Sequence, residues 1–255
     1  MSIAVASCSL AKLFSNQAIQ ASDGSWIEGV LSIPEYQRPY RWGEEQIKRL
    51  LKDYQQSQKQ GSTVSPYYLG SIILHQQLRG SDVRLNIIDG QQRITTLALL
   101  AFLEGQFQDT GLRYDSPESQ KQIRHNLNWL KAQHNDFSKL IDLDNISITL
   151  VVTLSEDDAY RFFETQNTGG VRLGGADIIK AHHLRATPKA QQNGFAKLWE
   201  SMGKLDTVID ALVKGRYWQK LNFREQPSHR QPQQIRTAIV SELAELTGGR
   251  VCLSR

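Results

Sequence analysis

The chain has 255 residues and a mass of 28.9 kDa, enough to bury a substantial core in one large domain or a domain with an appendage. Its composition, 40% hydrophobic and 22% charged, is ordinary for a soluble globular protein. The two cysteines, Cys8 and Cys252, argue against a disulfide scaffold and favour a reducing, cytoplasmic setting. The apolar run Ile3–Ala6 lacks the length and basic flank of a signal peptide. No apolar stretch is long enough to span a bilayer, so we expect no membrane partner.

The formal net charge of +4 is unevenly distributed along the chain. Residues 178–236 hold eleven Lys and Arg against four Asp and Glu, which leaves the rest of the chain acidic. A basic C-terminal third predicts a surface that faces a polyanion, and DNA is the expected partner. The alternative is that these charges only solvate the outer faces of helices.

The first predicted elements lie in the N-terminal fifth of the chain. Residues 15–32 are expected to be irregular, with a turn at Asp23-Gly24 and a short apolar segment after it. Two prolines exclude a helix interior from residues 34–42. A helix is expected after Gly43, because two glutamates suit a first turn and apolar residues follow at helical spacing.

Two strands and two helices are expected next. The apolar segments 67–75 and 83–88 predict strands that pair as a hairpin. A helix follows the Asp89-Gly90 turn and is expected to end near residue 108. A second helix, over about residues 117–137, is amphipathic.

The segment 146–154 is the clearest strand prediction, because it is rich in β-branched residues. A helix is expected to open at Ser155, with acidic residues in its first turn, and to end at residues 167–170. Another helix begins near Ala176. The remainder is expected to be helical, apart from a Pro/Gln-rich break over residues 226–234.

Strands and helices in this order predict an α+β (mixed α/β) fold. The strands would form a small mixed sheet flanked by helices, in a domain over residues 1–185. Residues 186–255 would form a mostly helical, basic extension.

The most informative segment is Asn86–Leu99, which reads NIIDGQQRITTLAL. A strand, a glycine turn and a helix N-terminus together form an anion site, because backbone N–H groups and the positive helix end point outward. Arg93 in the first turn suggests a phosphate bound there, and Asp89 could hold a divalent metal or a water. Gln91, Gln92 and Arg93 have no obvious core role. The alternative is a purely structural Asp-Gly turn, with Asp as the helix N-cap.

An aromatic, arginine-containing strip, Tyr36-Gln37-Arg38-Pro39-Tyr40-Arg41-Trp42, precedes the first long helix. In extended form it could line a pocket, with arginines on phosphate and aromatic faces stacked on a base. The alternative is that the aromatic residues anchor the following helix to the core. We expect Trp42 to be such an anchor, and Gln37 and Arg38 to be functional.

Other motifs have structural interpretations. Asn167 and the glycines after it could form a helix C-cap or allow a ligand to approach the backbone closely. The His182-His183 pair has no third ligand at metal-site spacing, so we expect a structural pair and not a zinc site. The sequence contains no nucleophile elbow, zinc-protease helix or complete nuclease motif. It therefore shows no catalytic motif for the hydrolysis of nucleic acid.

Within the basic C-terminal third, four residues are predicted to bind DNA phosphates: Lys214, Arg216, Lys220 and Arg224. Tyr217 and Trp218 lie among them, an arrangement that suits charge neutralisation combined with stacking. The alternative is that the aromatic residues pack on the core while the charges are solvated.

With these segments assembled, the chain resembles the N-terminal domain of GmrSD-type (type IV, modification-dependent) restriction systems, a relative of the ParB/sulfiredoxin fold. The resemblance covers about residues 27–184. It rests on segments that occur in the family's order: Ile33–Trp42, Tyr68–Leu74, Ile88–Leu97, Phe163–Leu173 and Asp177–Lys180.

The resemblance implies nucleotide binding, and NTP hydrolysis at the Asp-Gly-Gln-Gln-Arg turn, in a sensor module that acts in anti-phage defence. Carried over residue by residue, the catalytic positions are Asp89, Gln91, Gln92 and Arg93. The nucleotide-binding positions are Tyr36, Gln37, Arg38, Gly90 and Asn167. The implied cofactor is Mg²⁺ with a nucleoside triphosphate, held through water by Asp89. The alternatives are a non-hydrolysing nucleotide- or DNA-gated adaptor and a kinase-like phosphotransfer.

Family members of the restriction type usually continue into a His-Asn-His-like nuclease domain, whereas this sequence stops at Arg255. One expectation is a separate nuclease subunit as a partner. The other is that the sequence is a fragment or a regulatory remnant.

Overall fold

The computed structural model describes residues 3–59, 66–79, 82–106, 109–133, 140–155, 157–159, 162, 175–203 and 205–220. The chain divides into two compact units, Met1–Pro34 with Pro39–Gly169, and Glu35–Arg38 with Gly170–Arg255. The predicted helix end at residues 167–170 and the Pro/Gln-rich break lie outside the described residues. Among the helices in the described ranges, none is both long and apolar enough to cross a membrane.

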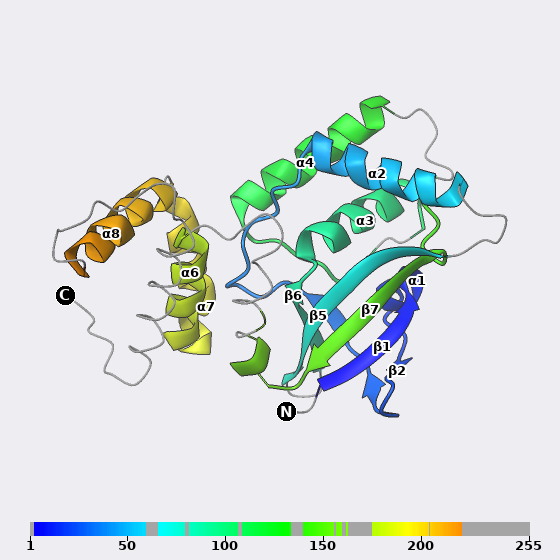
Figure 1. Ribbon diagram of the computed structural model, residues 1–255, viewed down its shortest axis with the longest axis horizontal. Helices are drawn as coiled ribbons and strands as arrows, with labels where there is room; N and C mark the ends of the chain where they lie inside the picture. Colours follow the sequence, from blue (N-terminus) through cyan, green and yellow to red (C-terminus); the bar gives the residue numbers. More distant parts are fainter. Residues whose placement is uncertain are drawn as a thin grey trace. The chain divides into compact units, whose positions relative to one another are not determined.

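The first unit is built on a mixed five-stranded sheet with the strand order β1-β7-β5-β6-β4 (Figure 1). The strands are β1 (Ile3–Ser9), β4 (Val30–Ser32), β5 (Tyr67–Arg79), β6 (Asp82–Asp89) and β7 (Ile146–Thr153). β1 pairs with β7 and β5 with β6 in antiparallel fashion, whereas β5 with β7 and β4 with β6 are parallel. Two short strands, β2 (Ile19–Gln20) and β3 (Trp26–Ile27), form a second sheet around the predicted Asp23-Gly24 turn.

Helices α2 (Glu44–Lys59), α3 (Gln91–Leu103) and α4 (Pro117–Gln133) lie on one side of the five-stranded sheet (Figure 1). The predicted α+β class, with a mixed sheet flanked by helices, is therefore confirmed. α3 ends at Leu103 and not near residue 108, because Gly105 takes a left-handed φ of +71° that terminates the helix. The expected end of α4 near residue 137 lies outside the described residues.

β1 and the short helix α1 (Leu10–Phe14) are additions to the predicted elements. The small and polar residues of β1 give little strand signal, but seven residues of β1 pair with β7, from Ile3 opposite Thr153 to Ser9 opposite Ser147. Tertiary pairing and not local propensity therefore forms this strand.

Alternation along the strands gives the sheet two different faces. On the helix-covered face, alternate residues of β7 from Ile146 to Val152 are buried in the core with residues of α2, α3 and α4. On the other face, Ser7, Thr149 and Ser71 stand side by side on β1, β7 and β5. Ser7 and Ser71 are exposed and Thr149 is half-buried. This part of the second face therefore reaches solvent.

The second unit contains α6 (Gly175–Ala186), which begins next to the predicted helix start at Ala176, and the helices α7 (Lys189–Ser201) and α8 (Leu205–Lys220). Lys180 of α6 is buried and its Nζ lies 2.8 Å from Oε1 of Glu200 on α7. The same Nζ donates a hydrogen bond to the carbonyl oxygen of Gln37 at 3.4 Å. A buried lysine thus joins α6, α7 and the segment Glu35–Arg38 within this unit.

The structural interpretation of the histidine pair is supported at His183. Its ring stacks on Trp199 at 6.2 Å and meets Phe195 edge-on at 5.4 Å, both on α7. His183 therefore packs α6 against α7.

Candidate functional site at the start of α3

The predicted anion site lies in the first unit, where β6 ends and α3 begins. Gly90 is the N-cap of α3, with φ +93°, and a Cβ atom there would collide with the Cδ1 of Ile72. Only glycine fits this position without strain. Asp89 is the last residue of β6 and does not cap the helix, so no side-chain cap satisfies the first turn.

Arg93, in the first turn of α3, is held by the backbone of β5. Its Nη1 donates to the carbonyl of Leu69 and its Nη2 to the carbonyl of Ser71, each at 2.9 Å. Between them, Gly70 has φ +113°, and the pairing of β5 with β7 shifts register at this point. A Cβ on Gly70 would lie 2.6 Å from Nη1 of Arg93. The guanidinium therefore fits onto a glycine-dependent bulge and is fixed in position.

Asp89 faces Arg93 across the start of the helix. Its Oδ2 lies 3.5 Å from Nη2 of Arg93, and the two side chains are 34% and 25% exposed. An ion pair of this length at a partly exposed site is weak. Both charges can therefore meet a ligand from solvent without breaking a strong bond.

Gln92 makes structural contacts, although the sequence gives it no obvious core role, and its predicted part in catalysis stays a prediction. Its side chain is only 6% exposed, and Oε1 accepts hydrogen bonds from the N–H groups of Arg41 at 2.8 Å and Trp42 at 3.1 Å. Its Nε2 donates to the carbonyl of Pro39 at 3.1 Å. Gln92 therefore ties the segment before α2 to α3.

Gln91 is also buried, and its Nε2 donates to the hydroxyl of Tyr114 at 3.1 Å. That hydroxyl also bonds Oγ1 of Thr95 at 2.6 Å. Burial raises the pKa of Tyr114 to about 12, so the phenol stays protonated. No sequence pattern pointed to Tyr114, because it lies on a loop more than 20 residues from its partner Gln91.

Tyr40 and Trp42 anchor the segment before α2. The Tyr40 side chain is fully buried, and its hydroxyl bonds Oγ1 of Thr96 at 2.8 Å and accepts from Nδ2 of Asn126 at 3.1 Å. The ring of Trp42 packs against the core, as expected, and its carbonyl accepts from Asn126 at 2.7 Å. The strip therefore splits, and this half of it is structural.

Tyr36, Gln37 and Arg38 belong to the second unit. Tyr36 and Gln37 are buried, and Arg38 is half-buried. Their share in a nucleotide site with Asp89 stays a prediction. Asn167 lies outside the described residues.

The residues predicted to bind DNA are only partly described. On α8, Lys214 is half-buried and Arg216 is exposed. Residues two apart on a helix point to different faces, so Lys214 and Arg216 do not share one face of α8, and their binding to DNA phosphates stays a prediction. The side chain of Lys220 and the whole of Arg224 lie outside the described residues.

No cluster of three or more His, Cys, Asp or Glu side chains forms a metal centre within the part of the chain that the structure describes. Magnesium commonly takes one carboxylate and completes its shell with substrate phosphates and waters. Asp89 fits that role, because its carboxylate is partly exposed at the start of α3.

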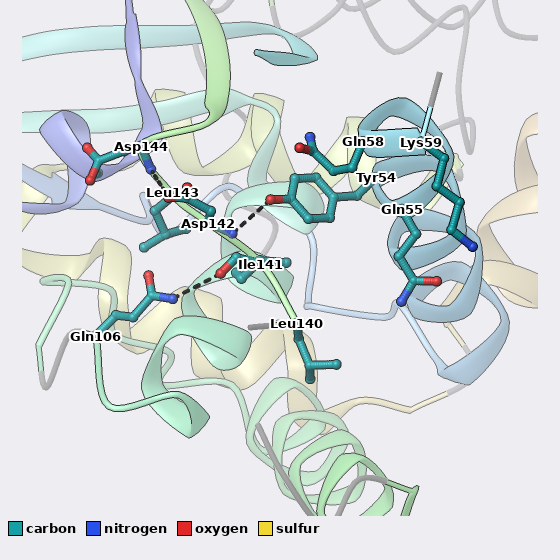
Figure 2. Close-up of a pocket in the computed structure, with 11 residues that line it drawn as sticks. Tyr54, Gln55, Gln58, Lys59, Gln106, Leu140, Ile141, Asp142, Leu143 and Asp144 are labelled. Carbon is teal, nitrogen blue, oxygen red and sulfur yellow. Dashed lines mark hydrogen bonds between the residues drawn. The ribbon is translucent and has the colours of Figure 1, made fainter. Parts of the chain in front are cut away.

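A pocket of about 850 Å³ lies elsewhere in the first unit, between α2 and the segment before β7 (Figure 2). In it, the hydroxyl of Tyr54 accepts a hydrogen bond from the backbone N–H of Asp142 at 2.9 Å. Its charged lining residues are Lys59, Asp142 and Asp144, and none of the predicted site residues lines it. A lining with two carboxylates and one ammonium does not suit a triphosphate.

Comparison with protein families places the chain among domains of restriction endonuclease systems. The family model that matches is the GmrSD restriction endonuclease, N-terminal domain, over residues 10–184. The chain therefore belongs to the GmrSD N-terminal domain family, as the sequence motifs predicted, and the match includes the start of α3. No curated protein matches the chain.

Proposed function

We propose that the start of α3 binds the phosphates of a nucleoside triphosphate with Mg²⁺, and that this binding makes the chain a nucleotide-responsive sensor in a modification-dependent restriction system. The observation that carries the proposal is the guanidinium of Arg93, which two carbonyls fix at an uncapped helix start while it stays partly exposed. A preorganised cation beside the positive end of a helix suits a polyphosphate.

Hydrolysis of the triphosphate uses the same groups in this proposal. Arg93 stabilises the charge that develops on the transferred phosphoryl group, and Asp89 holds the metal or the attacking water. Bound Mg²⁺ supplies charge neutralisation on the phosphate oxygens. The amide of Gln92 is occupied by three backbone groups, so we do not assign the orientation of water to Gln92.

A pair of matched asparagine variants tests the proposal. Asp89→Asn removes the carboxylate at the start of α3. Asp109→Asn removes the carboxylate of an exposed pair of the same spacing, Asp109 with Arg113. Phosphate release with Mg²⁺ should fall by roughly two to three orders of magnitude in Asp89→Asn and stay unchanged in Asp109→Asn. Equal rates in both variants would end the catalytic assignment.

A binding module without turnover is the second candidate, and the burial of both glutamines favours it. Gln91 and Gln92 are each at most 6% exposed, so neither amide is presented to a water beside the phosphate. A triphosphate labelled at its terminal phosphate separates the mechanisms. Free label indicates hydrolysis, label on the protein indicates phosphotransfer, and retention of intact nucleotide indicates an adaptor.

DNA is the proposed partner of the basic second unit, and a nuclease subunit is the proposed recipient of the nucleotide signal. The charge excess over residues 178–236 supports the first of these. Membership of a restriction-system family supports both.

A further inference from the structure

The pocket between α2 and the segment before β7 is large enough to hold a ligand, and the proposed phosphate site does not use it (Figure 2). Its volume of about 850 Å³ lies in the range of ligand-binding pockets. Its apolar lining residues Ile141 and Leu143 are buried. Three exposed amides also line it, those of Gln55, Gln58 and Gln106. The pocket therefore combines buried apolar surface with polar groups that can bind a ligand.

The segment before β7 forms one wall of the pocket and is held in place by two other elements. Oε1 of Glu104, at the end of α3, accepts a hydrogen bond from the N–H of Ile141 at 2.9 Å. Nε2 of Gln106 donates to the carbonyl of Ile141 at 3.1 Å. The carbonyl of Leu143 accepts from the N–H of Ala11 at 3.2 Å. Because this wall is already ordered, a ligand does not have to bear the cost of ordering it.

Tyr54 of α2 supplies a hydrogen-bond donor to the pocket. Tyr54 is only 7% exposed, and its hydroxyl oxygen accepts from the N–H of Asp142 at 2.9 Å. Burial raises the pKa of Tyr54 more than the N–H donors of Asp142 and Asn145 lower it, so the hydroxyl keeps its proton at neutral pH. No residue that the structure describes accepts a hydrogen bond from this proton. A buried donor in the lining favours a ligand that carries an acceptor, such as a carbonyl oxygen.

Two carboxylates, those of Asp142 and Asp144, give one end of the pocket a negative charge. Both residues are exposed, and Oδ1 of Asp142 accepts from the N–H of Asp144 at 3.0 Å. With the described residues taken together, neither carboxylate forms an ion pair. Figure 2 shows the one lysine of the lining, Lys59, at the opposite end of the pocket from Asp144. The end with the two carboxylates therefore favours a cationic group.

We propose that this pocket docks an extended, basic peptide segment of a partner protein, with a backbone carbonyl at the hydroxyl of Tyr54 and a lysine or arginine side chain at Asp142 and Asp144. An extended peptide carries acceptors and basic side chains on one chain, and its other amide groups match the glutamines of the lining. Charge complementarity is the argument for a basic partner. The pocket shares no lining residue with the start of α3, so the proposal does not depend on the phosphate site.

The test uses the full chain and a blocked, fluorescein-labelled heptapeptide of alternating alanine and lysine, titrated by fluorescence anisotropy at low salt. The double variant Asp142→Asn, Asp144→Asn should weaken binding by roughly 2- to 30-fold, the range expected for two exposed ion pairs. Asparagine keeps the Oδ1 acceptor at position 142, so the local turn is preserved. Tyr54→Phe keeps the ring and should weaken binding by roughly 2- to 10-fold, because one hydrogen bond is lost.

The double variant Asp23→Asn, Glu28→Gln is the matched control. It also removes two exposed carboxylates, but these flank the short strand β3 and do not line the pocket. Oδ1 of Asp23 accepts from the N–H of Ser25 at 3.0 Å, the same two-residue turn that Asp142 makes. This control should bind the lysine peptide as tightly as the unaltered chain.

Two further probes separate a docked peptide from a bound amine. A heptapeptide of alternating alanine and glutamate should not bind, because its charge is reversed. Spermidine has three positive charges, like the lysine peptide, and should not displace it at equal concentration, because it offers Tyr54 no carbonyl. Displacement by spermidine at that concentration would overturn the docking of a peptide.

The remaining outcomes decide the proposal as follows. Unchanged affinity in the variant of Asp142 and Asp144 overturns it, and so does equal weakening in the control variant of Asp23 and Glu28. Unchanged affinity in Tyr54→Phe overturns the contact with the carbonyl. If the unaltered chain does not bind the lysine peptide, the docking site is refuted, whereas the phosphate site is tested separately by Asp89→Asn.

Discussion

Replacing Gln92 with leucine should release the segment Pro39–Trp42 from α3. The change removes three hydrogen bonds, to the N–H groups of Arg41 and Trp42 and to the carbonyl of Pro39. Arg41 is exposed, so water can replace its former partner. The other two groups are buried or half-buried, and each costs about 1–3 kcal/mol when left without a partner. The free energy of unfolding should therefore fall by roughly 2–6 kcal/mol, a large share of the 5–15 kcal/mol typical of a domain.

Urea unfolding, followed by the fluorescence of the tryptophans, measures this destabilisation. Gln46→Leu is the matched control, because the side chain of Gln46 also bonds the backbone before α2, where it accepts from the N–H of Gly43 at 2.9 Å. That contact is exposed, so water can replace it and the control should be destabilised by less than about 1 kcal/mol. Equal destabilisation of the two variants would refute the conclusion that Gln92 holds the segment, and would make Gln92 a candidate for acting on the ligand.

Two further predictions concern pH and salt. Burial raises the pKa of Glu104, so its contribution to stability is present in acid and is lost as the pH rises through the raised pKa. Glu104→Gln keeps an acceptor for the N–H of Ile141 but does not titrate. Between about pH 4 and about pH 7, the free energy of unfolding should therefore fall less in this variant than in the unaltered chain, as measured by urea unfolding at both pH values. Binding to phosphates predicts that DNA affinity falls steeply with salt, and that neutralising the four predicted residues reduces the slope by about one unit for each phosphate that is no longer bound. The four residues are Lys214, Arg216, Lys220 and Arg224. Fluorescence anisotropy with labelled DNA measures both the affinity and its salt dependence, and an unchanged slope would show that these side chains are only solvated.

The main strands could be predicted because their residues carry local information. Segments 67–75 and 83–88 are mainly apolar, segment 146–154 is rich in β-branched residues, and all three lie in the sheet. β1 could not be predicted, because its stability comes from pairing with a strand about 140 residues away. Local propensity identifies strands whose own residues are apolar or β-branched. It misses a strand such as β1, which forms through pairing with a partner strand far away in the sequence.

The turn at Asp89-Gly90 could be located because its residue types carry local information. The hydrogen-bond partners of the side chains around it could not be predicted. Arg93 binds backbone carbonyls at a bulge in β5, and a carbonyl has no sequence signature. Gln92 binds backbone groups about 50 residues earlier in the chain. Residue types indicated the chemistry of this corner, whereas the use of each polar group depended on long-range packing.

The arrangement explains why a glutamine and an arginine stand side by side at the start of α3. Gln92 turns inward and binds the carbonyl of Pro39, where the chain passes into the first unit from the segment Glu35–Arg38 of the second. Arg93 turns toward β5 and stays partly exposed beside Asp89. One turn of helix therefore carries both the proposed phosphate ligand and the anchor of the segment Pro39–Trp42. In the proposed function, a ligand that shifts this turn would act directly on that segment.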